Sequence, residues 1–376
     1  MPRRDAETCG DPTESLCCLP SSLRGYQVKR EFVRRKETSM KVQRDVQTKI
    51  LSQSKAPLLE VCNLTKVFGS GLLQRGQKVA LKNFSMSIQG SPSKIISIAG
   101  ESGSGKTTLA RIILGFLLPT EGEVRYRGKD LKMMDQKSWQ IFRREVQAVF
   151  QDPYGVYNPF YPIDRVFEIV IRKFHLANNR QESRRITEES LVVVGLRPDE
   201  ILGKYPHQLS GGQRQRIMLA RAFLLKPKLI IADEPVSMID ASMRAIILKI
   251  IMDLKDNFGI SFLYITHDLS TAFQISDDII VLYEGLVAES GNAEIVIKSP
   301  KHPYVQLLVG SIPIPDPDQP WQGRVELPPE EELEKDTLRG CKFYRRCPYK
   351  MEICLENPPP LYNIGADHLA ACYLYK

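Results

Sequence analysis

One eight-residue segment has the composition of a phosphate-binding loop. Residues 100–107 read GESGSGKT and fit the pattern G-x-x-x-x-G-K-[ST] at every fixed position. Glycines leave room for backbone N–H groups to point at phosphate oxygens, and Lys106 can supply positive charge to the β- and γ-phosphates. An apolar run before the loop and helical spacing after it predict a strand and then a helix, whose N-terminus favours anions. The residues expected to bind ATP are Gly100, Glu101, Ser102, Gly103, Ser104, Gly105, Lys106, Thr107 and Thr108.

A second chemical element is the segment LIIADE, an apolar run that ends in the carboxylates Asp233 and Glu234. Asp233, at the end of the predicted strand, can hold the metal ion of a phosphate site together with the Thr107 hydroxyl. Glu234 is placed to polarise an attacking water as a general base. Two acids at a strand end are usually only a solvated surface feature, but the phosphate loop in the same chain favours the catalytic interpretation.

A third element, LSGGQ at residues 209–213, precedes an amphipathic run with helical spacing. Ser210 is a natural N-cap, and the two glycines after it leave the first backbone N–H groups of the helix bare. This pattern predicts a second anion site that has no lysine of its own. Taken alone, an ordinary helix cap and turn would look the same.

LSGGQ is also the signature of the ABC ATPase family, and residues 57–311 resemble that family. In this family two nucleotide-binding domains pair head to tail, and ATP lies between the phosphate loop of one domain and the signature of the other. The resemblance therefore implies that this chain contacts the ATP of a partner subunit. The residues concerned would be Ser210, Gly211, Gly212 and Gln213.

The family resemblance also implies roles for four residues outside these motifs. Gln151 in VFQDP matches the glutamine that senses the γ-phosphate and Mg²⁺, and His267 in YITHD matches the histidine that contacts the γ-phosphate. Asp240 in SMID matches the aspartate of the D-loop, which lies across the dimer interface. Phe68 in KVFG matches the aromatic residue on which adenine stacks. The family usually has SALD where this chain has SMID, which puts the fine geometry of that interface in question.

Together, these elements define the expected site. The catalytic residues would be Glu234, His267 and Gln151, and Mg²⁺ would be held through Thr107, Gln151 and Asp233. ATP and Mg²⁺ are the expected cofactors. Because every element of an active site is retained, a non-enzymatic subunit with a degenerate site is disfavoured.

Alternating strand and helix patterns predict an α/β fold. The resemblance implies an ABC ATPase (P-loop NTPase) cassette with a RecA-like core, an antiparallel β subdomain and an inserted helical subdomain at about 152–225. Residues 1–56 are expected to be a basic, flexible extension with one helix from about 26 to 50, and residues 57–311 the nucleotide-binding domain. Residues 312–376 would form a Pro-rich linker and a small Cys-rich C-terminal tail.

Further segments resemble the ATPases of oligopeptide and dipeptide permeases, and in particular their F-type subunit. They are QDPYGVYNP, DEPVS, SPKHPYVQLL and the tail segments CKFYRRCPYKMEIC and HLAAC. The resemblance implies coupling of ATP hydrolysis, at a composite dimer interface, to uptake of di- or oligopeptides or a related solute. The implied partners are a sister ATPase in a heterodimer, two transmembrane permease subunits and an extracellular or periplasmic solute-binding protein. A soluble ABC protein of translation or DNA repair is disfavoured, because this chain has one uninterrupted cassette.

Composition limits the remaining possibilities. The net charge of +8 is concentrated near the N-terminus, and no zinc-finger, RRM or recognition-helix pattern accompanies it, so we expect no nucleic-acid partner. No run of about 18 apolar residues occurs, so a protein working at the membrane would dock on other subunits. The expected location is peripheral, on the cytoplasmic face of the cell membrane.

Four of the eight cysteines, Cys341, Cys347, Cys354 and Cys372, crowd the last 36 positions. In a tail too short for a sizeable core, four thiolates could hold an iron–sulfur cluster of the [4Fe–4S] type. Structural Zn²⁺ is the alternative, although zinc sites usually use tight C-x2-C pairs, and none occurs here. Four unligated cysteines are the third possibility.

Overall fold

A computed structural model describes residues 56–69, 78–312 and 339–376. These residues belong to one compact unit, Ala56–Lys376. The predicted N-terminal extension and its helix lie outside the described residues, apart from Ala56. Within the described ranges, no helix combines the length and the apolar composition that a membrane span requires.

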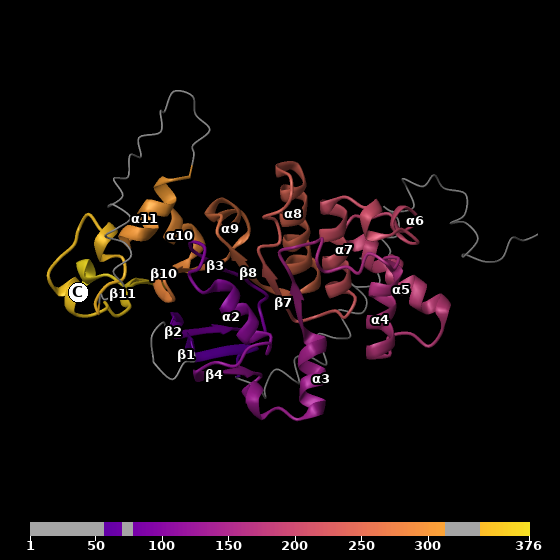
Figure 1. The fold of residues 1–376 in the computed structure, drawn as a ribbon, viewed down its shortest axis with the longest axis horizontal. Helices are drawn as coiled ribbons and strands as arrows, with labels where there is room; N and C mark the ends of the chain where they lie inside the picture. The colour runs from indigo at the N-terminus through magenta and orange to yellow at the C-terminus, as the bar shows by residue number, and fades with distance from the viewer. Residues whose placement is uncertain (1–55, 70–77, 313–338) are drawn as a thin grey trace, which may run out of the picture. The chain divides into compact units, whose positions relative to one another are not determined.

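The larger of two sheets carries the centre of the fold, with strand order β11-β12-β10-β9-β3-β8-β7-β6. Strands β9, β3, β8, β7 and β6 are parallel, whereas β10, β12 and β11 continue the sheet in antiparallel fashion. Every residue of β3 and β8 is buried, because helices cover both faces of the parallel part (Figure 1). The strands are β3 Ile95–Ala99, β6 Val146–Val149, β7 Leu229–Asp233, β8 Ser261–Thr266, β9 Asp278–Tyr283, β10 Leu286–Asn292, β11 Tyr362–Gly365 and β12 His368–Ala370.

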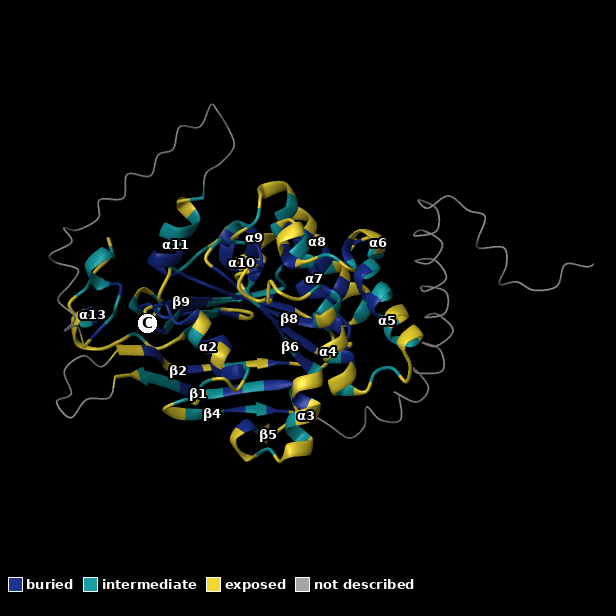
Figure 2. Ribbon diagram, turned by 45° about the vertical axis from the view of Figure 1, so that its right-hand side comes forward, coloured by how far each residue is buried: buried dark blue, intermediate teal, exposed yellow. Residues whose placement is uncertain are grey.

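A smaller sheet is antiparallel throughout and has the order β2-β1-β4-β5. Its strands are β1 Leu59–Phe68, β2 Lys78–Ile88, β4 Glu121–Tyr126 and β5 Lys129–Asp130. Figure 2 shows this sheet beneath helix α2, Lys106–Ile113. Leu81, Leu109 and Ile265 belong to the same apolar cluster, which therefore joins the small sheet, the helix and the large sheet.

The remaining helices fall into groups along the chain. They are α3 Gln136–Glu145, α4 Asp164–Phe174, α5 Arg180–Val193, α6 Pro198–Ile201, α7 Gly211–Phe223, α8 Ala241–Phe258, α9 Leu269–Ile275, α10 Ala293–Lys298, α11 Pro303–Gly310 and α13 Ile353–Glu356. Single 3₁₀ turns are η2 Leu131–Met133, η3 Pro206–Gln208, η4 Tyr344–Arg346 and η5 Tyr373–Tyr375. Helices α4 to α7 lie in the segment 152–225 and pack through Phe167, Leu191 and Ile217. Whether they form a separate subdomain remains a prediction.

The C-terminal tail joins the large sheet, a connection that the sequence analysis does not anticipate. Strand β12 pairs with β10, and the buried Glu289 of β10 accepts hydrogen bonds from the backbone N–H groups of Lys301 and His302 at 3.0 and 2.7 Å. The Glu289 carboxylate also lies 2.6 Å from Nε2 of His368. A buried carboxylate that meets three polar partners is stabilised at that position, so it holds the tail against the cassette.

Candidate nucleotide site

The phosphate loop lies between β3 and α2, as the sequence predicts, and its backbone requires glycine. Gly105 has a φ of 104°, and a Cβ on it would lie 2.2 Å from the backbone oxygen of Ala80. A Cβ on Gly100 would come equally close to the backbone oxygen of Leu282. The loop therefore packs on β2 and β9 through bare backbone, which fixes the direction of the following helix.

Lys106 is held inside the loop. Its side chain is buried, and Nζ donates to the carbonyl oxygens of Gly100 and Glu101 at 2.7 and 2.8 Å and to Ser104 Oγ at 3.4 Å. Burial lowers the pKa of Lys106, while Glu234 and Asp233 favour its charged form. The ammonium group is therefore pre-positioned at the point where the loop would enclose phosphate oxygens.

Thr107 and Asp233 face each other across the site, with Thr107 Oγ1 donating to Asp233 Oδ1 at 3.4 Å. Asp233 ends β7, and burial raises the pKa of its carboxyl group. A hydroxyl group and a carboxylate from separate elements are oxygen donors of the kind that Mg²⁺ takes. These two predicted ligands therefore fit the metal by chemistry and by proximity.

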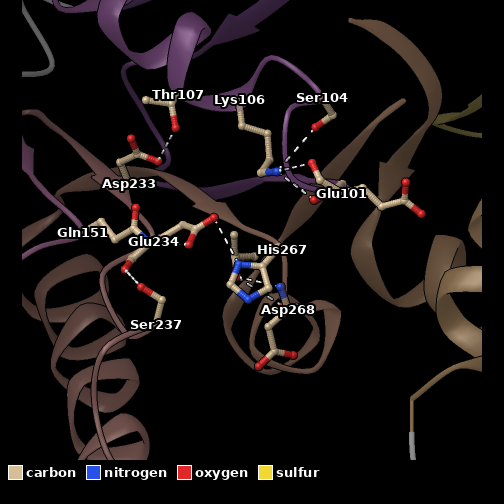
Figure 3. Close-up of polar contacts among 12 residues, drawn as sticks. Glu101, Ser104, Lys106, Thr107, Gln151, Asp233, Glu234, Ser237, His267 and Asp268 are labelled. Atoms are coloured by element: carbon tan, nitrogen blue, oxygen red, sulfur yellow. Dashed lines mark hydrogen bonds and ion pairs between the residues drawn. The ribbon is translucent and has the colours of Figure 1, made fainter. Parts of the chain in front are cut away.

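Glu234 occupies the centre of the polar group that Figure 3 shows. Its Oε1 lies 3.1 Å from Nδ1 of His267, and its Oε2 accepts from Gln151 Nε2 at 3.1 Å. Glu234 has a φ of 46°, a strained conformation for a side chain with a Cβ, and its N–H donates to the Ile265 oxygen at 2.9 Å. Strain of this kind is common where a side chain must point into an active site.

A cleft of about 760 Å³ collects these side chains in one place. Phe68, at the end of β1, stands at the cleft with its ring partly exposed, as expected of a base-stacking residue. Three further lining residues were not predicted: Lys78 and Ala80 belong to no motif, and Leu308 ends the segment SPKHPYVQLL, which implied no role at the nucleotide. The full lining is Phe68, Lys78, Ala80, Glu101, Ser102, Gly103, Gly105, Lys106, Thr107, Thr108, Gln151, Glu234, His267 and Leu308.

The signature and the D-loop lie elsewhere on this chain. None of the described residues that line the cleft comes from 210–213, and Asp240 is likewise absent from that lining. Ser210 caps α7, with Oγ accepting from the Gln213 N–H at 3.2 Å while Gln213 Oε1 accepts from the Ser210 N–H at 2.9 Å. Asp240, directly before α8, is exposed. One chain therefore brings together the phosphate-loop half of the expected site and leaves the signature half facing outward.

The four C-terminal cysteines come together at one cavity. All four line one narrow cavity of about 10 Å³ between η4, α13 and the end of β12. Burial raises the pKa of the thiols of Cys341, Cys347 and Cys372. Among the described residues, no group of three or more His, Cys, Asp or Glu side chains is arranged to hold a metal ion. The arrangement of these described residues therefore does not support the predicted iron–sulfur cluster.

Comparison with known proteins places this geometry in a family. The family "ABC transporter" matches residues 81–237, and the family "Oligopeptide/dipeptide transporter, C-terminal region" matches residues 288–354. The putative oligopeptide transport ATP-binding protein YkfD of Bacillus subtilis is 38% identical over 85% of this chain and 96% of its own length. The oligopeptide transport ATP-binding protein OppF of Salmonella typhimurium is 39% identical over 74% of this chain and 83% of its own.

The solved structures agree on the fold. The ATP-binding cassette MJ0796, solved as a dimer in a post-hydrolysis state with ADP and Pi, matches with a TM-score of 0.55 at 30% identity. The match covers 62% of this chain and 98% of that cassette. The predicted ABC ATPase cassette is therefore confirmed as the fold, with its mixture of sheets and helices. By sequence, by fold and by its two family matches, this chain is a member of the ABC transporter family, in the branch of oligopeptide and dipeptide transport ATP-binding proteins.

Proposed function

We propose that this chain is the ATP-hydrolysing subunit of a peptide importer, in which ATP binding and hydrolysis between two ATPase subunits drive uptake of di- or oligopeptides. The observation that carries the proposal is the position of Glu234. Its carboxylate lies between Gln151 and His267, at the cleft that also contains Lys106. A carboxylate held by two polar neighbours beside a phosphate loop can take the proton of an attacking water.

The other residues bind and orient the nucleotide. Lys106 and the loop N–H groups would hold the β- and γ-phosphates, and Phe68 would stack on adenine. Mg²⁺ would be held by Thr107 and Asp233, with the amide of Gln151 nearby, and would neutralise charge on the phosphate oxygens when bound. His267, with its ring exposed beside Glu234, would contact the γ-phosphate.

A partner ATPase would complete the site. The solved MJ0796 cassette is a dimer, and the exposed Ser210 caps a helix, beginning at Gly211, whose N-terminus is suited to anions. In the proposed arrangement these residues close on the ATP of the partner, and the exposed Asp240 lies across the same interface. We expect the partner to be a different, sister subunit, which makes the pair a heterodimer.

An apolar edge beside Gln151 would receive the permease subunits. Phe160 is 83% exposed, and Tyr154, Tyr161 and Ile169 are also largely exposed. Next to them lies a groove of about 320 Å³, lined by residues 156–158, 161–163, 165, 166, 169 and 206. Exposed aromatic residues beside a groove are typical of a protein interface. We therefore place the two transmembrane subunits on this side and the chain at the cytoplasmic face of the membrane.

The transported solute is inferred from the relatives. YkfD and OppF are named as oligopeptide transport proteins, and residues 288–354 match a family of oligopeptide and dipeptide transporters. Because an importer of this kind takes its cargo from an external protein, a solute-binding protein is the further expected partner. Di- or oligopeptides are the proposed cargo.

The cysteine cavity carries a separate proposal. Four thiols that line one small cavity could together hold a [4Fe–4S] cluster, and the role would be structural. Protein purified without oxygen should then be brown and contain about four iron and four sulfide ions per chain. Colourless protein with about one zinc would favour the alternative metal, and metal-free protein that folds normally would exclude both.

The function is tested on the assembled complex. A tag on this chain should co-purify two membrane subunits and a second ATPase from the source cells. In proteoliposomes, ATP hydrolysis by this complex should rise when its binding protein is added together with di- or oligopeptides. Glu234→Gln in the same complex should remove both the hydrolysis and the peptide uptake. Co-purification without membrane subunits, or hydrolysis that ignores peptide, would contradict the importer.

A further inference from the structure

The C-terminal tail reaches the phosphate loop directly, through a contact between residues 245 positions apart. Arg346, in the single turn η4, donates from Nη1 to Oε2 of Glu101 at 3.1 Å and from Nη2 to Oε1 at 3.0 Å. Glu101 is the second residue of the phosphate loop and lines the nucleotide cleft. A two-pronged guanidinium–carboxylate pair is the strongest and most directional form of ion pair.

Aromatic packing holds Arg346 in this position. The guanidinium group lies 5.9 Å from the ring centre of Tyr283 and 5.5 Å from that of Phe343. The two rings form one cluster with Tyr304, whose centroid is 4.5 Å from that of Tyr283 and 5.6 Å from that of Phe343. Arg346 is mostly buried, with 17% of its side chain exposed. The arginine therefore has little freedom to leave the pair.

The same cluster also binds the backbone of the phosphate loop. The Tyr304 hydroxyl, from α11, accepts a hydrogen bond from the Glu101 N–H at 3.0 Å. The Glu101 carbonyl oxygen in turn accepts from Lys106 Nζ at 2.8 Å. One residue thus connects the C-terminal elements to the lysine that the proposed function assigns to the phosphates.

The charge of Glu101 gives this contact a consequence for nucleotide binding. An unpaired carboxylate on the phosphate loop would repel the triphosphate and compete with it for Lys106. In Figure 3 the Glu101 carboxylate points away from Lys106 Nζ, while the Glu101 backbone oxygen remains on the lysine side. Arg346 neutralises that carboxylate and holds it in the outward direction.

We infer that Arg346 is a positioning residue for nucleotide binding, by which the docked C-terminal tail sets the affinity of the phosphate loop for ATP. The inference rests on the proposed function only in that the loop binds ATP. It assigns the tail a part in the ATPase cycle, which depends on the pair Arg346–Glu101 and not on any metal.

The test is a double-mutant cycle on the full chain, with Mg²⁺–ATP binding measured by calorimetry. Arg346→Gln should raise Kd for Mg²⁺–ATP roughly five- to thirtyfold in the wild-type background. In the Glu101→Gln background, the same change should raise Kd less than about twofold, because the carboxylate to be neutralised is gone. Lys350→Gln, which removes one exposed charge from the same tail, is the matched control and should leave Kd unchanged.

Other outcomes would overturn the inference. Equal losses of affinity in both backgrounds would make Arg346 a purely structural residue, and unchanged affinity in Arg346→Gln would remove any role. If Arg346→Gln lowers the melting temperature sharply, Arg346→Lys replaces it in the test, because lysine keeps the positive charge but cannot form the two-pronged pair. The increase in Kd caused by Arg346→Lys must then disappear in the Glu101→Gln background, or the inference fails. Lys106→Ala distinguishes a failure of this inference from a failure of the proposed function. If ATP binding does not change in Lys106→Ala, the nucleotide site itself is refuted.

Discussion

Two loops of this chain lead into helix N-termini with bare backbone donors, yet their surroundings differ. In residues 100–107 the helix starts after Gly105, in a conformation that L side chains rarely adopt, and Lys106 is turned into the loop. In residues 209–213 the helix starts after Ser210, which shares a reciprocal pair of hydrogen bonds with Gln213. The phosphate loop carries its own cation and lies beside Asp233 and Glu234, whereas the signature loop has no cation of its own and does not lie beside these acids.

This difference shows that a local motif predicts an anion site but does not predict where ATP hydrolysis takes place. Both loops satisfy the same rule for helix N-termini. Only the phosphate loop opens on the cleft that also contains Glu234 and His267. We therefore expect the signature loop to be one component of a site that a second subunit completes, and the two loops should respond differently to mutation.

The largest effect is expected at the catalytic carboxylate. Glu234→Gln keeps the shape of the side chain but cannot take a proton, so ATP hydrolysis in the assembled complex should fall by about 10² to 10⁴. ATP binding should persist, since Glu234 donates nothing to the nucleotide. Phosphate release measures the rate, and Glu294→Gln, which removes an exposed carboxylate paired only with Lys298, is the control. A Glu234→Gln complex that hydrolyses ATP at the normal rate would refute the assignment.

The next effect concerns the cation of the phosphate loop. Lys106→Ala removes the buried ammonium group, so the affinity of the isolated chain for Mg²⁺–ATP should fall roughly 10- to 100-fold. Calorimetry measures the affinity, and Lys298→Ala, on the exposed face of α10, serves as the charge-matched control. Normal ATP affinity in Lys106→Ala would show that the cation of the phosphate loop does not bind the nucleotide, and this difference between the two loops would be refuted.

A smaller effect is expected from the glycine that begins each loop's helix. Gly105→Ala would place a Cβ 2.2 Å from the Ala80 backbone oxygen at a φ of 104°, so the free energy of unfolding should fall by about 1–3 kcal/mol. Gly211→Ala would place a Cβ 3.0 Å from the Tyr154 hydroxyl, at the end of a side chain that can move, and should cost under about 1 kcal/mol. Denaturant unfolding of both variants gives the comparison. Equal losses would show that the phosphate loop is not specially constrained.

Much of this comparison is predictable from sequence, because its parts are local. The phosphate loop, the two acids at the end of β7 and the signature each lie within a few consecutive residues, and the glycine and helix-cap rules act at that range. The confirmed fold follows from continuous apolar strands such as β3 and β8, which alternate with helices along the chain and are buried on both faces. Even the approach of Gln151 and His267 to Glu234 follows once the family resemblance is recognised.

What the sequence does not reveal depends on contacts between distant residues. Arg346 meets Glu101 across 245 positions, and no spacing rule connects them. Strand β12 has three residues, too few for a period-2 pattern, yet its pairing with β10 adds the tail to the large sheet. Helix α3 has ten residues, fewer than the window of about 11 to 18 residues over which a helical period is recognised, so no pattern predicts it. The gathering of the four cysteines at one cavity likewise depends on how the tail folds, not on their spacing.

The smallest effect on the isolated chain, and the sharpest test of the comparison, is expected at Ser210. Asp and Asn both cap helices well and have the same shape, so Ser210→Asp and Ser210→Asn differ mainly in one negative charge. Because Ser210 does not line this chain's own cleft, both variants should keep the affinity of the isolated chain for Mg²⁺–ATP within about twofold of the wild type. In the complex, the Asp carboxylate would instead meet the phosphates of the partner's ATP and repel them. In a Glu234→Gln background, ATP-dependent pairing with the sister subunit, followed by analytical ultracentrifugation, should therefore fail for Ser210→Asp and persist for Ser210→Asn.

If both variants pair equally, the signature does not touch the partner's phosphates. If both lose ATP affinity as isolated chains, the signature belongs to this chain's own site, and the division of roles between the two loops is wrong.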